Sequence, residues 1–583
     1  MTTTDAVLDE PGPDGEEDGA GADRAGGPKE PADLLGLLAV AGAGLLPVVL
    51  VDDLYWGTWA PKAALCLVLL FPGLVALGRL VVSGSRPAVL AAAFLATACV
   101  STALSDRPAL SLFGAANWGT GLLFLATLAG SWALGTLAGD RRRRQLVVVI
   151  LGAVIVNALV AWSQARVGTG GRTRGLMGNP VYLGGLVAGG LFLLGRRFGR
   201  ERRSWWWLAA VALVAGAAQL SGGRAAVALS LLALLASLRG AGVVRGAALV
   251  AAVAVGVTLA PVGAKAPELA STRAAPATVV SRNDTRFAVW RVSLGAIGER
   301  PLVGWGPGRF PTATGPRYNA VAAQEGVVLK DAHNWVVENA VTTGLVGVAL
   351  LLAWLAAAAW GARGPLAGFA LVVAASSLVQ PMHVALTPMA MVALGAAGTG
   401  NQRPRRAGDP VRGGGLGRGW SAAAVVGLGG GLVLALVLMT GQWYLQRGVQ
   451  GDSLSDIRRA AALSPPWPEL EVKAADAEAD LGLDEGEPHK QRTLEHARRA
   501  VLRDPTDPAL WASLGALELD WGTNPAAATA FRHALKDNPW DISSLLGRVT
   551  LAGRQGDQAG LAEGCRRLRV LGHASSACAA PPR

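Results

Sequence analysis

The feature that most constrains this chain is a recurring apolar run. From Leu34 to about Thr440, apolar stretches of roughly membrane-spanning length alternate with short clusters of Arg, Pro and Gly. In a bilayer such runs satisfy their backbone hydrogen bonds as helices. With 51% hydrophobic and 16% charged residues, the chain is too apolar for a soluble multidomain protein. We predict an all-α, polytopic membrane helix bundle of about thirteen helices, at residues 33–51, 61–82, 87–104, 117–138, 145–163, 180–195, 204–220, 225–238, 246–262, 334–359, 365–380, 383–398 and 421–441.

The basic linkers indicate an orientation, because all of them fall on even-numbered connections. They are Arg141 to Arg144, Arg196 to Arg203, Arg239 with Arg245, Arg363, and Arg403 to Arg418. Positive residues mark the cytoplasmic side, so we predict a multi-pass plasma-membrane protein with its N-terminus inside and its C-terminus outside. The net charge of +12 therefore reflects membrane orientation, and we expect no nucleic-acid partner. Residues 1–32 are acidic and rich in Gly and Pro, which predicts a disordered cytoplasmic tail.

One outer connection, residues 263–333 within the membrane domain 33–441, is too long and too polar to be a simple turn. Its basic residues run against the positive-inside trend: Lys265, Arg273, Arg282, Arg286, Arg291, Arg300, Arg309, Arg317 and Lys330. Cations kept on the outer face indicate an anionic ligand there.

The tail at residues 451–572 predicts a short soluble α-solenoid of two to four helical units. Roughly seven of the eight signature positions of a tetratricopeptide repeat match within residues 508–541: Trp511, Leu514, Gly515, Ala527, Phe531, Ala534 and Pro539, with Glu518 as the departure. Pro505 and Pro539 lie one 34-residue period apart. Solenoids of this kind present a surface for protein partners. In an oxidising compartment Cys565 and Cys578 can pair, although two cysteines can also simply pack in a helical hairpin.

Polar residues at the predicted outer ends of helices are the candidates for chemistry. Arg224 follows Ser221, Gly222 and Gly223, and either grips a diphosphate with its guanidinium fork or reaches toward lipid headgroups. The same two interpretations hold for Arg286 and Arg291, which are five residues apart and so do not share one helix face.

His333 lies where the long connection meets the next helix. A neutral imidazole there can take a proton from an attacking hydroxyl, or it can be an interfacial histidine hydrogen-bonded to Asn334 or water. His383 is a weaker candidate of the same kind. We find no metal-ligand spacing, P-loop, dinucleotide loop or nucleophile elbow in the sequence, and therefore expect no metal and no cofactor.

The long connection resembles a known family. Arg286 and Trp290 lead into Pro301 to Phe310, and the connection closes on His333 and Asn334, followed by Gly344 and Gly347. This arrangement is similar to the O-antigen ligase and Wzy-type polymerase superfamily of integral-membrane glycosyltransferases, as are the segments at 105–114, 172–185 and 221–226. The resemblance covers roughly residues 90–400, and superfamily members can also carry C-terminal tetratricopeptide-like repeats on the outer face.

The resemblance implies a GT-C-like helix bundle and a metal-independent, inverting glycosyl transfer outside the membrane. The donor would be a glycan on a polyprenyl diphosphate such as undecaprenyl diphosphate, and the acceptor a hydroxyl of a glycan, lipid or protein, in cell-envelope polysaccharide biosynthesis. Arg224 and Arg286 would hold the diphosphate, and His333 would position or deprotonate the acceptor. Supporting contacts would come from Asn334, Arg291, Arg172 and Arg174.

Other functions stay open. A ligase that transfers a finished glycan and a polymerase that joins repeat units share the same donor chemistry, and the motifs do not separate them. A lipid or oligosaccharide transporter predicts charged residues near the bilayer midplane, whereas those here concentrate at the outer rim. A scaffold that uses only its repeats is a further alternative. The sugar, the linkage stereochemistry and the oligomeric state are not encoded in any motif.

Overall fold

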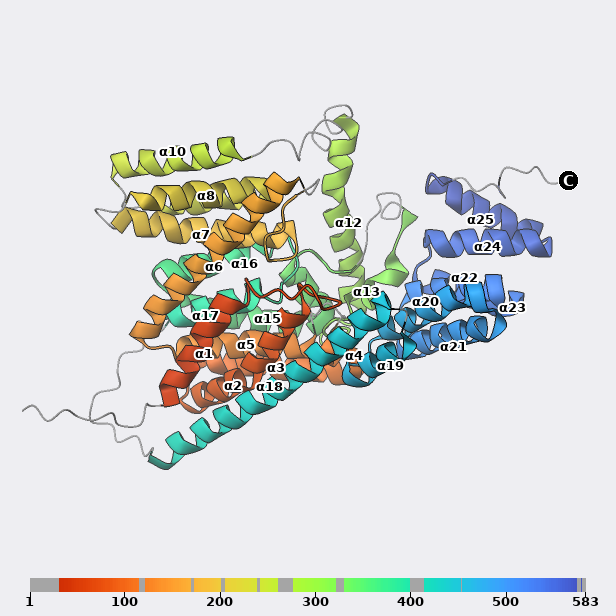
Figure 1. Ribbon diagram of the computed structural model, residues 1–583, viewed down its shortest axis with the longest axis horizontal. Helices are drawn as coiled ribbons and strands as arrows, with labels where there is room; N and C mark the ends of the chain where they lie inside the picture. Colours follow the sequence, from red (N-terminus) through yellow and green to blue (C-terminus); the bar gives the residue numbers. More distant parts are fainter. Residues whose placement is uncertain are drawn as a thin grey trace, which may run out of the picture.

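The computed structural model describes residues 31–114, 121–168, 172–200, 205–238, 242–260, 276–320, 330–398, 414–451, 453–573 and 578. The predicted disordered tail and much of the predicted long connection, namely 261–275 and 321–329, lie outside these residues. Within them the fold is helical and contains no strand, so the predicted all-α fold class is confirmed (Figure 1).

Thirteen apolar helices occupy the positions that the sequence predicts. Among the described residues, six helices are long and apolar enough to cross a membrane, and seven shorter ones are also apolar. They are α1 (Pro31–Leu45), α2 (Ala60–Val82), α3 (Arg86–Ala103), α5 (Leu122–Thr136), α6 (Asp140–Val167), α7 (Pro180–Arg200), α8 (Trp206–Leu220), α9 (Arg224–Ser237), α10 (Val243–Leu259), α15 (Trp335–Trp360), α16 (Pro365–Ser376), α17 (Leu386–Gly398) and α18 (Gly414–Gln450). Several ends differ from the prediction: α1 stops at Leu45, two residues before Pro47, whereas α6 extends at both ends to Asp140–Val167. Helix α18 runs from Gly414 to Gln450, a stretch that contains no proline.

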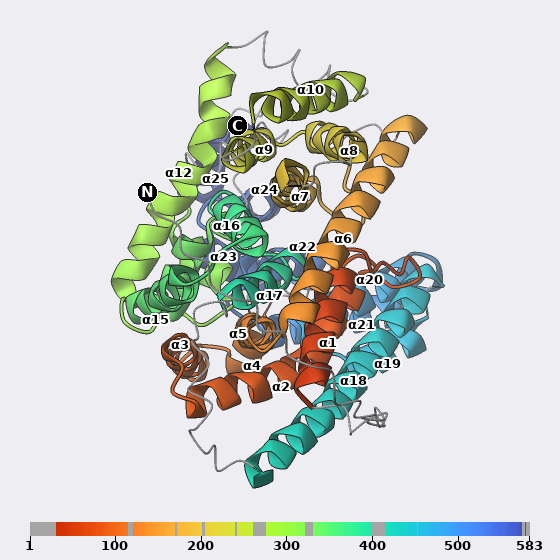
Figure 2. The same cartoon turned by 90° about the vertical axis from the view of Figure 1, so that its left-hand side faces the viewer.

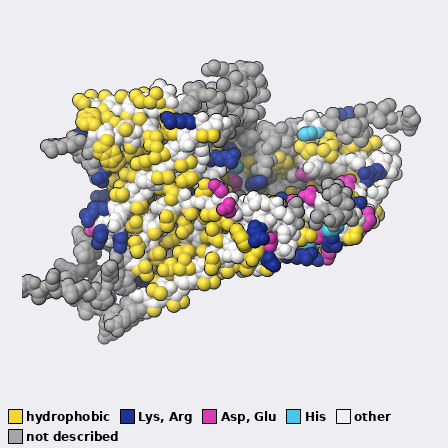
Figure 3. All heavy atoms as spheres, viewed as in Figure 1, with side chains coloured by type: hydrophobic (Ala, Val, Ile, Leu, Met, Phe, Trp, Pro, Cys, Tyr) yellow, Lys and Arg dark blue, Asp and Glu magenta, His cyan; other side chains and the backbone are white. Residues whose placement is uncertain are grey.

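Small residues let these helices approach closely, as is usual in membranes. A Cβ added to Gly73 of α2 would lie 2.6 Å from the Cα of Gly130 in α5. Likewise, a Cβ on Gly135 would lie 2.1 Å from the carbonyl oxygen of Val392 in α17. Figure 3 shows hydrophobic side chains over the bundle, whereas charged side chains gather over the C-terminal repeats.

The odd-numbered connections between apolar helices meet at one end of the bundle, as an alternating topology requires. Lys62 Nζ donates to the carbonyl oxygens of Val49 and Leu176, which belong to the first and fifth connections. The amide of Trp335 donates to the carbonyl oxygen of Ser377 and so joins the ninth connection to the eleventh. We call this the solenoid end, because the C-terminal repeats lie against it (Figure 1).

Four further elements lie at the solenoid end: the long helix α12 (Pro276–Glu299) and the short elements α4 (Pro108–Phe113), α13 (Phe310–Thr314) and the 3-10 helix η2 (Gly315–Arg317). Helix α12 packs against α15 and stands at the edge of the bundle (Figure 2). Its Trp290 Nε1 donates to the carbonyl oxygen of Ala332 at 3.0 Å, which ties α12 to the segment just before α15.

The C-terminal repeats are α19 (Leu454–Leu463), α20 (Pro468–Glu485), α21 (Glu487–Arg503), α22 (Pro508–Trp521), α23 (Asn524–Asp537), α24 (Ile542–Gln555) and α25 (Gln558–Val570). After α19 they form three successive helical hairpins, which is the predicted α-solenoid. In the central hairpin Phe531 is buried, and a Cβ on Gly515 would lie 2.6 Å from its ring, which explains the glycine of the repeat signature. Glu518, the departure from that signature, is buried and accepts hydrogen bonds from Arg498 at 2.6 and 2.9 Å.

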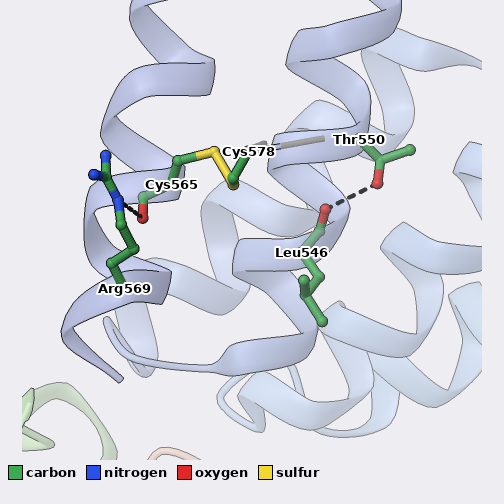
Figure 4. The surroundings of a disulfide bond; sticks show 5 residues. All are labelled: Leu546, Thr550, Cys565, Arg569 and Cys578. Atoms are coloured by element: carbon green, nitrogen blue, oxygen red, sulfur yellow. Dashed lines mark hydrogen bonds between the residues drawn. A yellow bond between two sulfur atoms is a disulfide. The ribbon is translucent and has the colours of Figure 1, made fainter. Parts of the chain in front are cut away.

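Cys565 of α25 and Cys578 form a disulfide (Figure 4). It closes the last hairpin against the segment that follows it. Of the two interpretations open from sequence, the structure therefore supports pairing. Cys66 and Cys99 are free.

Candidate active site

A break in helix α15 organises the candidate site. Gly344 has φ 74° and ψ 177°, a conformation that interrupts the helix and that glycine adopts without strain. The interruption frees carbonyl groups inside an apolar bundle, where unpaired polar groups are costly. The Pro301–Phe310 segment satisfies them: the amide of Trp305 donates to the Val341 oxygen at 3.1 Å, and the amide of Gly306 donates to the Thr342 oxygen at 2.8 Å.

We call this paired arrangement of residues 301–310 with the break in α15 the glycine clasp. The two backbone segments of the clasp lie too close together to leave room for side chains where they meet. A Cβ on Gly304 would be 2.5 Å from the Thr342 backbone, and a Cβ on Gly344 would be 2.3 Å from the Leu302 oxygen. The Leu345 amide completes the clasp by donating to the Pro301 oxygen at 2.7 Å. The glycines of the motif are therefore required by packing between two backbones.

His333 stands next to the clasp in a strained conformation. Its φ of 50° is the only positive value at a non-glycine residue among the described parts of the chain. Left-handed backbone at such a residue is costly and tends to persist at functional sites. The His333 amide and its Nδ1 both lie close to Oδ1 of Asp331, at 2.8 and 2.6 Å. This geometry leaves Nε2 of the half-exposed imidazole available to another molecule.

Charged neighbours set the protonation of His333. The hydrogen bond that His333 donates to Asp331 is the largest influence and raises the pKa of the imidazole above its usual value, against the effects of burial and of the positive charge of Arg286. Arg286, an exposed residue of α12, is therefore close enough to His333 to act on it electrostatically. Of the three predicted catalytic residues, His333 and Arg286 thus interact electrostatically, whereas the described residues show no hydrogen bond or ion pair between them.

Two other predicted site residues, Asn334 and Arg291, belong to the helices that carry or flank His333. Asn334 caps α15, its Oδ1 accepting from the amides of Val336 and Val337 at 2.9 and 3.2 Å. Arg291 is exposed five residues after Arg286 on α12, which turns it by roughly 140° around the helix. The two arginines therefore point to different sides, as expected from their spacing.

The other predicted arginines lie around the start of α9. Arg172 Nε donates to the Ser221 carbonyl oxygen at 2.7 Å and lies over Gly222. The backbone amide of Arg174 is held by Gln164 Oε1 at 3.0 Å, while its side chain is exposed. Arg224 is the first residue of α9, and its side chain lies outside the described part of the structure. Within the described residues, no hydrogen bond or ion pair joins Arg172 or Arg174 to His333, so their roles stay predictions.

Several further polar residues line the same end of the bundle; of these, only His383 was named from the sequence, as a weaker candidate. Tyr182 is close enough to Asp331 to interact with it electrostatically, and its ring lies 3.9 Å from that of His383. His383 is buried, and its Nδ1 accepts from the amides of Ala385 and Leu386. Glu338 is buried in the first turn of α15 and accepts from the amide of Ala332 at 2.8 Å. The most important residue missing from the sequence-based candidates is Asp331. Its position two residues before His333 was a signal that could have identified it.

Comparison with known proteins assigns this part of the chain. Residues 209–352 match the O-antigen ligase family. The match begins in α8, ends in α15, and includes Arg224, Arg286, Arg291, Asp331, His333 and Asn334. The resemblance to the O-antigen ligase superfamily is confirmed for this segment. It supports a membrane protein of the ligase or polymerase type that acts in polysaccharide biosynthesis.

Other comparisons add little to this assignment. No curated protein matches the chain. Among solved structures, the crystal structure of the APC/C hetero-tetramer Cut9-Hcn1 is similar at a TM-score of 0.20 and 11% identity, over 78% of this chain and 75% of that one. A likeness at this level does not define a common fold.

Proposed function

We propose that this protein is an O-antigen ligase-like glycosyltransferase that moves a glycan from a polyprenyl diphosphate to an acceptor hydroxyl on the extracytoplasmic face of the membrane. The observation that carries the proposal is the strained His333, paired with Asp331 inside the segment that matches the O-antigen ligase family. A histidine held through Nδ1 has the arrangement of an oriented general base.

The proposed reaction forms one bond and breaks one. Nε2 of His333 takes the proton from the acceptor hydroxyl as its oxygen attacks the anomeric carbon. The bond between that carbon and the diphosphate oxygen breaks, and the electron pair leaves with the carrier diphosphate. Attack from the side opposite to the leaving group inverts the configuration. Arg286, with Arg224, is assigned to offset the charge that develops on the diphosphate, and this proposal needs no metal or cofactor.

The proposed orientation has two supports. The described basic residues Arg141 to Arg144 and Arg363 lie on connections opposite to the solenoid end, and the other basic linkers follow the same alternation in the sequence, which favours a cytoplasmic position for them. The disulfide between Cys565 and Cys578 favours an oxidising compartment for the repeats. Reporter fusions at Arg143 and after Arg583 test this topology. A cytoplasmic signal at Arg143 and an external signal at Arg583 are expected, and the reverse pattern would overturn the proposed face of the reaction.

The decisive experiment is reconstitution of the full chain with a polyprenyl-diphosphate oligosaccharide and candidate acceptors. Release of carrier diphosphate is followed together with product length. His333→Ala is expected to lower the release rate about 100- to 10,000-fold, because general acid–base catalysis contributes that much. His573→Ala, at an exposed histidine of the repeats, is the matched control and should not change the rate.

Product length separates the two forms of the reaction. A single transferred glycan supports the ligase, whereas a ladder of lengths indicates the Wzy-type polymerase, the alternative that shares the same donor. If folded His333→Ala protein releases carrier at the rate of the unchanged protein, His333 is not the base and the mechanism fails.

A further inference from the structure

The solenoid is attached to the membrane bundle by the same part of each repeat. Three turns that each precede a helical hairpin face the bundle: residues 464–467 after α19, and residues 504–507 and 538–541 between successive hairpins. In the first, Trp467 Nε1 donates to the Gly114 carbonyl oxygen at 3.1 Å. At the third, a Cβ on Gly315 would lie 2.6 Å from the carbonyl oxygen of Asp537, and Tyr318 packs against the same apolar cluster as Trp540. The repeats therefore contact the bundle through these turns, and they lie beside α13 (Figure 1).

The middle turn makes a buried ion pair with the glycine clasp. Arg309 donates from Nη1 and Nη2 to the two carboxylate oxygens of Asp504 at 2.8 and 2.9 Å, and the two side chains are only 6% and 9% exposed. Burial alone would raise the pKa of Asp504, but the hydrogen bonds and charge of Arg309 outweigh it and lower that pKa. Thr506 accepts from Arg309 at 2.5 Å and lies 3.2 Å from the hydroxyl of Thr312. Removing one partner of such a pair leaves an uncompensated buried charge.

A short packed route leads from this ion pair to His333. Arg309 directly precedes Phe310, which is fully buried in a small apolar cluster with Val289, Ala332 and Val341. Ala332 is the residue between Asp331 and His333. This cluster therefore sets the position of His333. Its largest buried residue, Phe310, follows Arg309, and Arg309 is bound to Asp504 of the solenoid.

We infer that the solenoid is a working part of the transferase, and that Asp504 is a positioning residue which holds His333 in its reactive place through Arg309, Phe310 and Ala332. This inference rests on the proposed function. It goes beyond the expectation that the repeats present a surface for protein partners, because it assigns them a role in the transfer step itself.

The test combines a weakened contact with a replacement link in the full chain. Asp504→Asn removes the charge that pairs with Arg309. Asp507→Asn is the matched control, because it lies in the same turn and asparagine caps α22 as well as aspartate does. Thr312→Cys with Thr506→Cys places two thiols where the hydroxyls are 3.2 Å apart, so that oxidation can lock the solenoid to the clasp. Each single cysteine variant serves as its control.

We expect Asp504→Asn to lower kcat about 100-fold, as small misplacements of catalytic groups do, with little change in KM. Asp507→Asn should keep the original kcat. Adding the oxidised cysteine pair to Asp504→Asn should restore most of the activity, and a reductant should remove it again. A role confined to folding or to partner recruitment would not respond to the lock in this way.

Three results would overturn the inference. One is unchanged kcat in Asp504→Asn when hydrogen exchange shows that the 504–507 turn has come away from the clasp. Another is unchanged exchange at that turn, because the ion pair would then not hold the solenoid. The third is an inactive locked protein, because the solenoid would then have to detach during turnover. Full activity of His333→Ala would instead refute the proposed function and leave the docking measurements standing.

Discussion

Replacement of Asp331 by Asn tests how the candidate base is held. The change keeps the shape of the side chain but removes the negative charge 2.6 Å from His333 Nδ1. Two unit charges about 4 Å apart interact by about 4 kcal/mol at an effective dielectric constant near 20. Because the His333 side chain is 45% exposed, solvent screening reduces this to roughly 2–3 kcal/mol. The imidazolium formed during proton transfer loses that stabilisation, so kcat should fall roughly 30- to 150-fold.

The pH dependence of the rate should shift in a direction that the structure predicts for each variant. A base must be neutral to accept a proton, so the rate falls as the pH drops below the pKa of His333. Asp331 raises that pKa and Arg286 lowers it. The acid limb of the profile should therefore move to lower pH in Asp331→Asn and to higher pH in Arg286→Gln. Tyr182 and Glu338, which also face Asp331, remain unchanged in both variants.

The assay is carrier-diphosphate release by reconstituted protein between pH 5 and 9, a range that extends from about 1.5 units below to about 2.5 units above a typical histidine pKa. Thermal unfolding of each variant establishes that it is folded. If folded Asp331→Asn keeps the original kcat and the original acid limb, the carboxylate neither orients nor charges the histidine, and the assignment of His333 as base loses its structural support.

Two further predictions concern stability. Gly344→Ala should unfold at a much lower temperature than Gly364→Ala, because both glycines have positive φ but only a Cβ on Gly344 meets another backbone, 2.3 Å from the Leu302 oxygen; equal loss in thermal scans would show that the clasp tolerates a side chain. Cys565→Ser should destabilise the last hairpin by about 3 kcal/mol, since the disulfide closes a loop with a sequence separation of 13 residues, and unchanged unfolding in denaturant would contradict this.

The helical architecture was largely predictable, because long apolar runs and a 34-residue period are local patterns. The match of thirteen apolar helices and three hairpins follows from them. Docking of the solenoid was not predictable, since the contact between Arg309 and Asp504 joins residues 195 positions apart and no periodicity marks either one.

The candidate site likewise contains residues that the sequence could identify and contacts that it could not. His333 stands out in the sequence because it closes a recognisable motif. Its partner Asp331 is two residues away, but their contact depends on the left-handed backbone of His333, and that conformation has no signature in the residue type. The burial of His383 against Tyr182 likewise depends on how α7 meets the connection after α16.

The glycine clasp has a consequence for how relatives of this chain should be judged. Its glycines are required because two backbone segments pack closely together. Proton transfer is instead assigned to the side chains of His333 and Asp331, which are not part of that backbone contact. A paralogue could lose the histidine and its aspartate while keeping every clasp glycine, and a motif search would still recover it. Such a pseudoenzyme would share the architecture without the chemistry. Genome surveys of this superfamily should therefore score the Asp-x-His triplet separately from the glycines.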